Sequence, residues 1–397
     1  MKKNKILFLC SNMQIGGFQK SLINLLEYID YDKFDVDLLL VDTTGIYMKF
    51  INKNVNILNF KDVSSYFLSY KESFKQLIHE RKYILALKRT VNLILSIINK
   101  GYGAIYMSRQ IPIINKKYDV SIDYCGQYLN YYMIDKVDAK KKITYFHNDY
   151  SKWDYYYSAD KIYYDKDNYI ITVSQNCVDA LKCYFPQYKN KILCIENIIT
   201  KKTIDLFNKK VLDSKMLNKI QNKKVIVTVG RVCLDKGIDL AIECAKNLKK
   251  ESLNFIWIWV GPGEIQKYHD RVIEYNLEQE FIFTGGQINP YAYMQVADIV
   301  VHPARFEGKA VAVEESLVMN LPIIVTDYSS ANDQIENNIT GFIVPFDKDM
   351  ICNKINLLFS SHNEIEKIKS NQKRYCKGNS NEIKKLYSLL SQEDDMN

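Results

Sequence analysis

Short apolar runs alternate with longer amphipathic segments along almost the whole chain, and this alternation constrains the fold more than any other feature. The runs are continuous stretches of β-branched and leucine residues, which is typical of parallel strands buried on both faces. In the first half we expect strands at residues 5–10, 35–41, 54–60, 118–124, 141–147 and 169–174. In the second half we expect them at 224–230, 254–261, 281–285, 298–303, 322–327 and 341–345.

Helical spacing of apolar residues fills the segments between these runs. We expect helices at residues 18–29, 237–250, 264–277, 291–297, 309–320 and 381–392, and one or two long helices at 72–100. Two successive sets of strands and helices predict an α/β chain of two doubly wound, Rossmann-like parallel-sheet domains that face a central cleft. The length of 397 residues is sufficient for two domains of ordinary size.

The polar residues 199–223 carry no strand signal and are expected to link the two domains. The predicted organisation is therefore an N-terminal domain at 1–198, a linker at 199–223, a C-terminal domain at 224–375 and a terminal helix at 376–397. We expect that helix to pack back on the N-terminal domain. Open parallel sheets bind ligands beyond the carboxyl ends of their strands, so the site is expected on loops that follow strands.

Cysteine usage and hydropathy indicate a cytoplasmic protein. The nine cysteines form no C-x-x-C pair, so neither a disulfide framework nor structural zinc is expected. The apolar run near the start of the chain is too short for a signal peptide. No run reaches the roughly 18 apolar residues of a membrane span, and the nearest, at 83–100, is interrupted by Lys88 and Arg89.

Positive charge is concentrated in one part of the first half. The net charge is +8, and residues 1–200 hold 28 Lys and Arg against 20 Asp and Glu. Residues 71–118 alone hold ten basic and two acidic side chains. This segment fits an anionic membrane surface or an anionic ligand, with a solvated helix flank as the plain alternative. Nucleic acid is not expected as a partner, because no nucleic-acid-binding motif accompanies the charge.

Two glycine-containing loops follow predicted strands. Gly16 and Gly17 stand just before a helix, where glycines let the backbone approach a ligand and the helix start favours an anion. A plain strand-to-helix turn is the alternative. The loop at 261–263 is a weak signal, because neither loop has the G-x-G-x-x-G dinucleotide fingerprint.

The segment GRVCLDKG at residues 230–237 places two cations at the end of a predicted strand. Arg231 and Lys236 there suit a diphosphate, since each charge-assisted hydrogen bond contributes roughly 1.5–3 kcal/mol. The alternative is a pair of solvated surface cations.

The segment ARFEGKAVAVEES at residues 304–316 combines carboxylates with a predicted helix start. Glu307 can accept hydrogen bonds from hydroxyl groups. Gly308, Lys309 and Ala310 are expected to begin the helix, with free backbone N–H groups aimed into the cleft. Eight helical residues span roughly 12 Å, about the reach from a sugar across a diphosphate to a ribose. Periodicity alone does not decide whether Glu314 or Glu315 faces the site, and a solvated glutamate pair is the alternative.

These two segments and NLPIIVTD at residues 320–327 resemble, in order and spacing, the retaining glycosyltransferases of family 4, which have the GT-B fold. The resemblance covers essentially the whole chain and is strongest over residues 224–346. The family's E-x7-E pattern falls on Glu307 and Glu315, and this choice excludes Glu314. In the family the first glutamate contacts the donor sugar and the second contacts the ribose.

The resemblance also assigns the other site residues. Arg231 and Lys236 match the family's diphosphate ligands, Gly16 and Gly17 match its N-terminal glycine loop, and Gly308, Lys309 and Ala310 complete the donor site. The usual E-G-F-G is here Glu-Gly-Lys-Ala, as in a subset that resembles capsule and exopolysaccharide enzymes. Lys309 in place of an aromatic residue leaves the donor sugar open.

Three further polar residues follow predicted strands. His147 matches a family histidine at the acceptor side of the cleft, with Asp149 as a weaker companion. His302, before Pro303, is interpreted as pocket wall. The D-x-D pairs at 165–167 and 347–349 lie in polar segments away from predicted strand ends, so no metal is expected, in agreement with the family's metal independence.

The resemblance implies a retaining hexosyltransferase that uses a UDP- or GDP-linked sugar, with Glu307, His147, Lys236 and Arg231 as catalytic residues and no cofactor. The implied acceptor is a glycan or a polyprenyl-diphosphate-linked glycan in capsular, exopolysaccharide or lipopolysaccharide synthesis. It would be bound by the N-terminal domain, with residues 71–118 holding the inner face of the plasma membrane. A non-catalytic nucleotide-sugar-binding subunit and a GT-B nucleotide-sugar epimerase are the alternatives. A sugar phosphorylase is disfavoured, because it needs a pyridoxal-binding lysine and a much longer chain.

Overall fold

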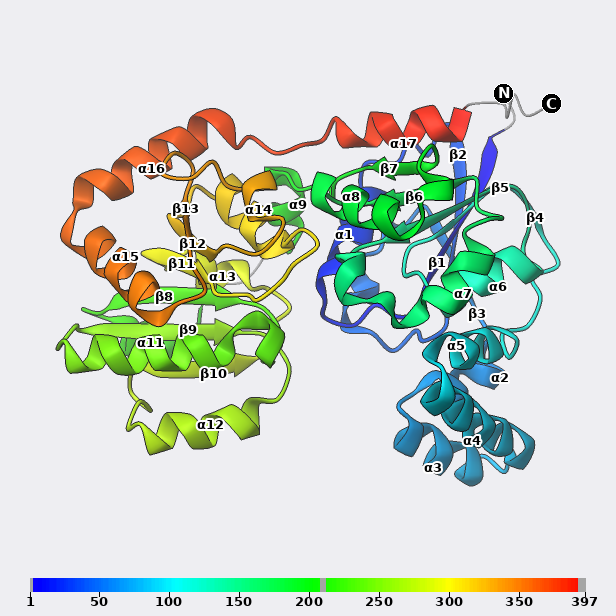
Figure 1. Ribbon diagram of the computed structural model, residues 1–397, viewed down its shortest axis with the longest axis horizontal. Helices are drawn as coiled ribbons and strands as arrows, with labels where there is room; N and C mark the ends of the chain where they lie inside the picture. Colours follow the sequence, from blue (N-terminus) through cyan, green and yellow to red (C-terminus); the bar gives the residue numbers. More distant parts are fainter. Residues whose placement is uncertain (1–2, 208–211, 392–397) are drawn as a thin grey trace. The chain divides into compact units, whose positions relative to one another are not determined.

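The structure is a computed structural model that describes residues 3–207 and 212–391. It divides into two compact units, named here the N-terminal unit (Met1–Glu196 with Glu382–Asn397) and the C-terminal unit (Asn197–Asn381). Each unit contains one parallel β-sheet (Figure 1). The two sheets confirm the predicted fold class of two Rossmann-like domains.

The sheet of the N-terminal unit has seven strands, and every neighbouring pair is parallel. In spatial order they are β3 (Val55–Asn59), β2 (Phe34–Leu40), β1 (Asn4–Cys10), β4 (Lys117–Asp123), β5 (Asp138–Phe146), β6 (Tyr169–Thr172) and β7 (Ile192–Cys194). Ile6–Cys10 of the central strand β1 are completely buried, as its continuous apolar sequence predicts. The strand order reverses between β1 and β4, so the loops after these strands lie at the topological switch point.

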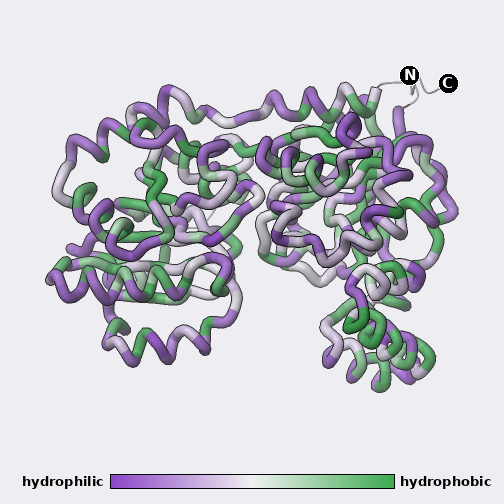
Figure 2. The backbone as a smooth tube through the Cα atoms, in the orientation of Figure 1, coloured by the Kyte–Doolittle hydropathy of each residue, from purple (hydrophilic) through white to green (hydrophobic). Residues whose placement is uncertain are grey.

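Nine helices belong to the described part of the N-terminal unit. They are α1 (Gly17–Leu26), α2 (Lys61–Ser64), α3 (Tyr70–His79), α4 (Tyr83–Ile98), α5 (Lys100–Ser108), α6 (Tyr128–Lys136), α7 (Tyr157–Tyr163), α8 (Gln175–Tyr184) and α17 (Glu382–Ser391). Helices α3 to α5 include the predicted helical region at 72–100 and form a group beside the sheet (Figure 1). Figure 2 shows hydrophobic residues along these helices.

The C-terminal unit has six strands, again with every neighbouring pair parallel. In spatial order they are β10 (Phe281–Gly285), β9 (Phe255–Val260), β8 (Lys224–Val229), β11 (Ile299–His302), β12 (Ile323–Thr326) and β13 (Phe342–Val344). The switch point lies between β8 and β11. The loops after these two strands carry Arg231, Lys236 and Glu307.

Eight helices surround this second sheet. They are α9 (Lys201–Phe207), α10 (Ser214–Ile220), α11 (Ile238–Lys250), α12 (Ile265–Glu274), α13 (Tyr291–Met294), α14 (Val311–Val318), α15 (Lys348–Ser360) and α16 (His362–Tyr375), within the described residues. Side chains from α11, α12 and α15 pack on β8 and β9 in one buried cluster that includes Trp257 and Trp259. This cluster fixes the sheet from which the β8 and β11 loops project.

Several segments differ from the expectation drawn from sequence. Residues 199–223 were expected to be a linker between the domains. Helices α9 and α10 lie in this segment and belong to the C-terminal unit. Residues 208–211 lie outside the described residues. Strand β7 was not predicted, because its three-residue apolar run lacks the glycine and proline that flank the equally short β13. Of the expected terminal helix, α17 packs in the N-terminal unit, where the Tyr387 hydroxyl donates to the Tyr28 carbonyl at 2.8 Å. Residues 392–397 lie outside the described part.

Candidate functional site

The loop after β8 is held in place by close backbone packing against the loop after β9. The Trp259 indole N–H donates to the Gly230 carbonyl at 2.9 Å. A Cβ on Gly261 would lie only 1.9 Å from that carbonyl oxygen, so the position requires glycine. Gly261, a weak nucleotide-binding signal in the sequence, therefore has a structural function in this packing.

The same loop also packs against the chain after β11. Gly237 has φ +72°, and a Cβ there would lie 1.8 Å from the Pro303 carbonyl oxygen. Arg305, which the sequence did not single out, donates from Nη1 and Nη2 to the two carboxylate oxygens of Asp239 in α11, at 2.8 and 2.6 Å. These contacts fix the two loops relative to each other.

Lys236 and Glu307 meet where these loops come together. Lys236 Nζ lies 2.5 Å from Glu307 Oε1, and the Nε2 of His302 lies 2.8 Å from the same oxygen. A carboxylate only accepts hydrogen bonds, so Nε2 of His302 carries the proton. His302 was interpreted from sequence as pocket wall; in the structure it is a hydrogen-bond partner of Glu307.

The surroundings of Glu307 keep it ionised. Burial alone would raise its pKa, but the charge of Lys236 and the hydrogen bond from His302 lower the pKa to about 2. Glu307 Oε2 has no hydrogen-bond partner among the described residues, so it remains able to accept a bond from a ligand. At neutral pH Glu307 is a permanent acceptor and has no proton to give as an acid.

Arg231 lies five residues before Lys236 in the loop after β8. Its guanidinium is exposed and makes no ion pair or hydrogen bond within the described part of the chain. Together Arg231, Lys236 and Glu307 carry a net charge of about +1 at neutral pH. The positive charge faces solvent, which suits an incoming anion.

The segment Gly308–Ala310 differs from expectation. Helix α14 begins at Val311, so these residues precede the helix. The Ala310 N–H is not free, because it donates to the Gln334 side-chain oxygen at 3.0 Å. Only part of the stretch from Glu307 to Glu315 is helical, so the estimate of about 12 Å for eight helical residues does not apply to it.

Lys309 is buried, which is unusual for a lysine. Its Nζ lies 3.5 Å from Glu314 Oε1, and Glu314 also accepts a hydrogen bond from Gln334 Nε2 at 3.1 Å. Glu314 therefore takes part in a network that supports the loop.

Glu315 is almost completely buried in α14. The Tyr291 hydroxyl donates to Glu315 Oε1 at 2.7 Å. Both glutamates of the predicted E-x7-E pattern thus lie inside the C-terminal unit, with Glu307 held by Lys236. Their roles toward a donor stay predictions.

In the N-terminal unit, Gly16 and Gly17 lie at the start of α1, after β1. Gly16 is the N-cap residue with an extended backbone, and a Cβ there would lie 2.2 Å from Gln19 Oε1. The Gln19 amide donates to Asn12 Oδ1 at 3.0 Å and so ties the helix to the loop. The two glycines therefore lie where the chain bends into the start of α1. Their predicted part in binding a donor stays a prediction.

His147 follows β5 and packs among aromatic rings. Its ring stacks on Tyr145, with centroids 5.6 Å apart, and its Nε2 lies 3.2 Å from the Tyr124 carbonyl oxygen. Because a carbonyl only accepts, Nε2 carries the proton, and the buried Nδ1 has no partner in the described structure. Burial lowers the pKa of His147 to about 4, so the ring is neutral at physiological pH.

The predicted companion Asp149 is buried and caps a short turn by accepting from the Ser151 N–H at 2.9 Å. Its role in binding an acceptor stays a prediction.

The D-x-D pairs also have structural partners. Asp347 caps α15, and Asp167, expected in a polar loop, is instead buried against Asn130. Within the described residues, no group of three or more His, Cys, Asp or Glu side chains is arranged to hold a metal ion.

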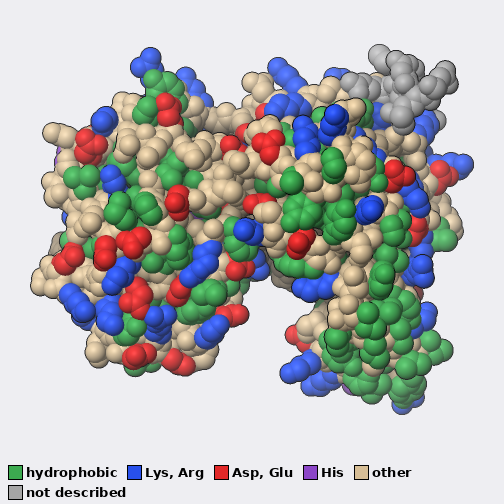
Figure 3. All heavy atoms as spheres, in the orientation of Figure 1, with side chains coloured by type: hydrophobic (Ala, Val, Ile, Leu, Met, Phe, Trp, Pro, Cys, Tyr) green, Lys and Arg blue, Asp and Glu red, His purple; other side chains and the backbone are tan. Residues whose placement is uncertain are grey.

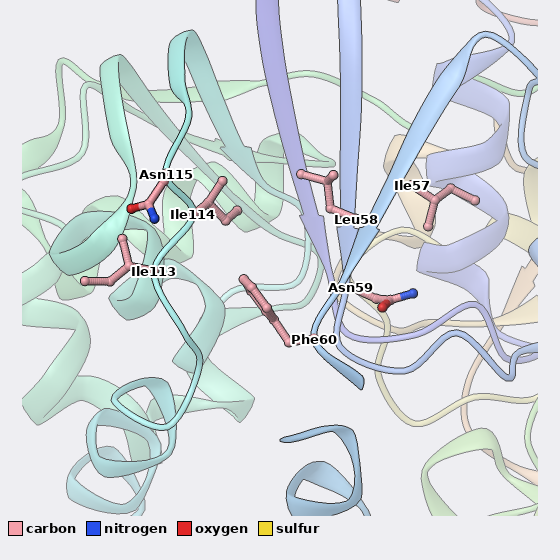
Figure 4. A pocket seen from close by; sticks show the side chains of 7 residues that line it. All are labelled: Ile57, Leu58, Asn59, Phe60, Ile113, Ile114 and Asn115. Atoms are coloured by element: carbon pink, nitrogen blue, oxygen red, sulfur yellow. The ribbon is translucent and has the colours of Figure 1, made fainter. Parts of the chain in front are cut away.

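A separate hollow lies at the edge of the N-terminal sheet (Figure 4). It is lined by Ile57–Phe60 from β3 and its end and by Ile113–Asn115 before β4. It contains none of the residues that the sequence singled out.

Across the described ranges 3–207 and 212–391, no helix is long and apolar enough to span a membrane.

Comparisons with known proteins agree with this architecture. S. aureus TarM, solved with UDP, alpha-GlcNAc-glycerol and fondaparinux, superposes with a TM-score of 0.70 at 15% identity, covering 98% of this chain and 100% of that one. An uncharacterized glycosyltransferase of Methanocaldococcus jannaschii is 25% identical over 178 residues, 45% of this chain and 44% of the relative.

The UDP-Gal:alpha-D-GlcNAc-diphosphoundecaprenol alpha-1,3-galactosyltransferase of Escherichia coli is 28% identical over 160 residues, 39% of this chain and 41% of the relative. Both curated relatives are thus matched over less than half of their length. The family model described as "Glycosyl transferases group 1" matches residues 209–375, the part that contains Arg231, Lys236 and Glu307. This match covers less than half of the chain, so the C-terminal unit is similar to that family, and the chain as a whole has the GT-B fold.

Proposed function

We propose that this chain is a retaining glycosyltransferase of family 4 that moves a sugar from a nucleotide sugar to a glycan or a lipid-linked glycan. The observation that carries the proposal is the cluster of Lys236, His302 and Glu307 at the switch point of the C-terminal sheet, with the exposed Arg231 in the same loop as Lys236. This is where open parallel sheets bind their ligands. Two cations and one permanent carboxylate acceptor match a diphosphate joined to a sugar.

The proposed chemistry is electrostatic. As the bond between the sugar and the diphosphate breaks, negative charge grows on the leaving phosphate. Arg231 and Lys236 would stabilise that charge, and Glu307 would hold a donor hydroxyl through its unpartnered Oε2. A diphosphate would draw Lys236 partly away from Glu307, so the ion pair of the free protein is expected to loosen when the donor binds.

Retention is proposed to follow a front-face route. Glu307 is a poor nucleophile, because Lys236 and His302 hold its pKa at about 2 and so make the carboxylate a weak base. The leaving diphosphate itself would then take the proton of the attacking hydroxyl group. His147 and Asp149 are proposed to contact the acceptor.

UDP is the nucleotide to try first, because TarM was solved with UDP and the E. coli relative is named for a UDP-linked sugar. The acceptor of that relative is a diphosphoundecaprenol-linked sugar. This supports a lipid-linked acceptor and an enzyme of cell-surface polysaccharide synthesis at the inner face of the plasma membrane.

The test begins with a thermal-shift screen of UDP- and GDP-linked sugars against the full chain, because a true donor raises the melting temperature by mass action. The best donor is then incubated with and without glycan acceptors, and UDP or GDP release is measured together with the anomeric configuration of the product by NMR. Release of nucleotide with a retained anomer supports the proposal. Donor binding without any release would identify a binding subunit, and an inverted product would refute the front-face route.

A further inference from the structure

Helix α4 of the N-terminal unit buries two polar side chains and exposes six large apolar ones. Arg89 and Asn92 are buried, at 9% and 3% exposure. Six large apolar side chains are 52–76% exposed: Tyr83, Ile84, Leu87, Ile94, Ile97 and Ile98. A helix on a solvated protein surface has the opposite arrangement, with its apolar stripe against the core.

The rotation of α4 is fixed by the buried polar side chains. Arg89 Nη1 donates to Asn92 Oδ1 at 2.5 Å, and Nη2 donates to the Leu68 carbonyl at 3.1 Å. The Asn92 amide in turn donates to the Gly103 carbonyl of α5 at 2.6 Å. Turning the helix to bury its apolar side would break the bonds to the Leu68 and Gly103 carbonyls, which join α4 to other segments. The outward apolar side is therefore specified by the fold.

The exposed apolar surface continues onto the two neighbouring helices. Phe74 and Ile78, one turn apart on α3, are exposed, as is Tyr102 on α5. These three side chains and the six of α4 are named here the apolar face. Figure 3 shows hydrophobic side chains gathered over α3 and α4, with lysines and arginines at the edges. Contiguous apolar surface of this kind marks a site of contact with a protein or a membrane.

The charges around the apolar face are mainly positive. The exposed cations of α3, α5 and the residues that flank them are Lys71, Lys75, Arg81, Lys100 and Arg109. Of the two acidic residues in this region, Glu80 is already paired with Lys82 at 2.7 Å. Apolar side chains flanked by lysine and arginine are the pattern of an element that lies in the interface of a membrane with anionic lipids. With 16 residues, α4 is shorter than the roughly 20 residues of a spanning helix.

We propose that the apolar face enters the headgroup region of a bilayer that contains anionic lipids, while the surrounding lysines and arginines bind the headgroup phosphates. A second copy of the chain fits less well, because a twofold contact would bring the same cations against each other. This membrane contact rests on the proposed function, because a lipid-linked acceptor is presented at a membrane surface. Its test does not depend on catalysis.

The test measures flotation of the full chain with vesicles of phosphatidylcholine alone and of phosphatidylcholine with phosphatidylglycerol. We expect binding to the anionic vesicles, weakened as salt rises. Leu87→Gln and Ile98→Gln, which change no charge, are each expected to weaken binding roughly tenfold, because each removes a buried apolar side chain from the bilayer. Leu357→Gln is the matched control, since Leu357 is an exposed leucine on α15 of the C-terminal unit.

Insertion is measured directly with Ile84→Trp. The introduced indole is expected to shift its fluorescence to the blue on anionic vesicles, while Leu357→Trp shows no shift. Absence of binding to anionic vesicles at low salt, or equal loss in the Leu357→Gln control, would overturn the proposal. So would a dimer in light scattering that Leu87→Gln dissociates, without vesicle binding. UDP binding is measured on the same samples, so that a failed membrane contact and a failed nucleotide site are told apart.

Discussion

In the C-terminal unit, Lys236 Nζ and Glu307 Oε1 lie 2.5 Å apart, although 71 residues separate them in the chain. The contact joins the loop after β8 to the loop after β11, on either side of the switch point. His302 donates to the same oxygen, so one carboxylate oxygen gathers two donors. The proposed function depends on this contact between Lys236 and Glu307. The expected outcomes below concern this cluster, the nearby loop residue Arg231, and His147.

Glu307→Gln is expected to lower the rate of transfer by roughly 10- to 100-fold or more, because it removes a charge-assisted acceptor for a donor hydroxyl. The measurement is the initial rate of nucleotide release with the donor found by thermal shift. Glu278→Gln is the control, since Glu278 is exposed and has no hydrogen bond or ion pair in the described structure. Turnover of Glu307→Gln within twofold of the unmodified protein would remove Glu307 from the site.

Arg231→Ala tests the diphosphate site with little effect on the fold, because the exposed Arg231 side chain makes no ion pair or hydrogen bond within the described residues. We expect UDP affinity to fall roughly 10- to 100-fold in calorimetric titration, with an unchanged melting temperature. Uridine, which has no phosphate, should lose little affinity. Lys250→Ala, at an exposed cation of α11, is the matched control. Equal losses for UDP and uridine would mean that Arg231 does not bind phosphate.

Acid should destabilise the protein through Glu307. The folded pKa, about 2, lies below the ordinary value of 4.5, so this group adds stability that is present above about pH 4.5 and is lost as pH falls toward 2. The full contribution is on the order of 3 kcal/mol. Glu307→Gln should flatten the corresponding part of the stability curve measured by urea unfolding between pH 5 and 3. An identical pH dependence in the two proteins would contradict the assignment.

His302 is expected to act by positioning Glu307. His302→Ala removes one donor to Oε1 and should lower kcat more than it changes KM, while raising the pKa of Glu307 toward its ordinary value. His302→Gln supplies an amide donor and should recover part of both effects. If the two substitutions lower kcat equally and leave the acid stability curve unchanged, the hydrogen bond has no functional role.

His147 is expected to remain neutral across the physiological range. Burial lowers its pKa from 6.5 to about 4, so it stabilises the fold above pH 6.5 and this contribution is lost as pH falls toward 4. An NMR titration of the His147 ring proton should show no midpoint above pH 5, with His147→Gln used to assign the signal. A midpoint near 6.5 would show that the ring is not buried as described.

The strands could be predicted from sequence because each is a continuous apolar run, as in the completely buried Phe255–Val260 of β9. Strand β7 was not predicted because its short apolar run is not bounded by glycine or proline, as the equally short β13 is. Arg231, Lys236 and Glu307 were found from residue type and position after strands, and the structure brings Lys236 and Glu307 together. Their catalytic roles remain untested.

Contacts between residues distant in the chain were not predictable. The bond from Ala310 to Gln334 spans 24 residues, and no local pattern announces it. The same is true of the pair between Arg305 and Asp239, which are 66 residues apart. Lys309 is buried although lysine is usually exposed, and its Nζ lies 3.5 Å from Glu314 Oε1 in the first turn of α14. Such facts depend on tertiary packing, which periodicity does not encode.

The most direct test of the central claim is a crystal structure of the full chain with UDP. The account predicts that the two phosphates lie within hydrogen-bonding distance of Arg231 and Lys236, with Glu307 beside the terminal phosphate. UDP bound with its phosphates away from both Arg231 and Lys236 would contradict it.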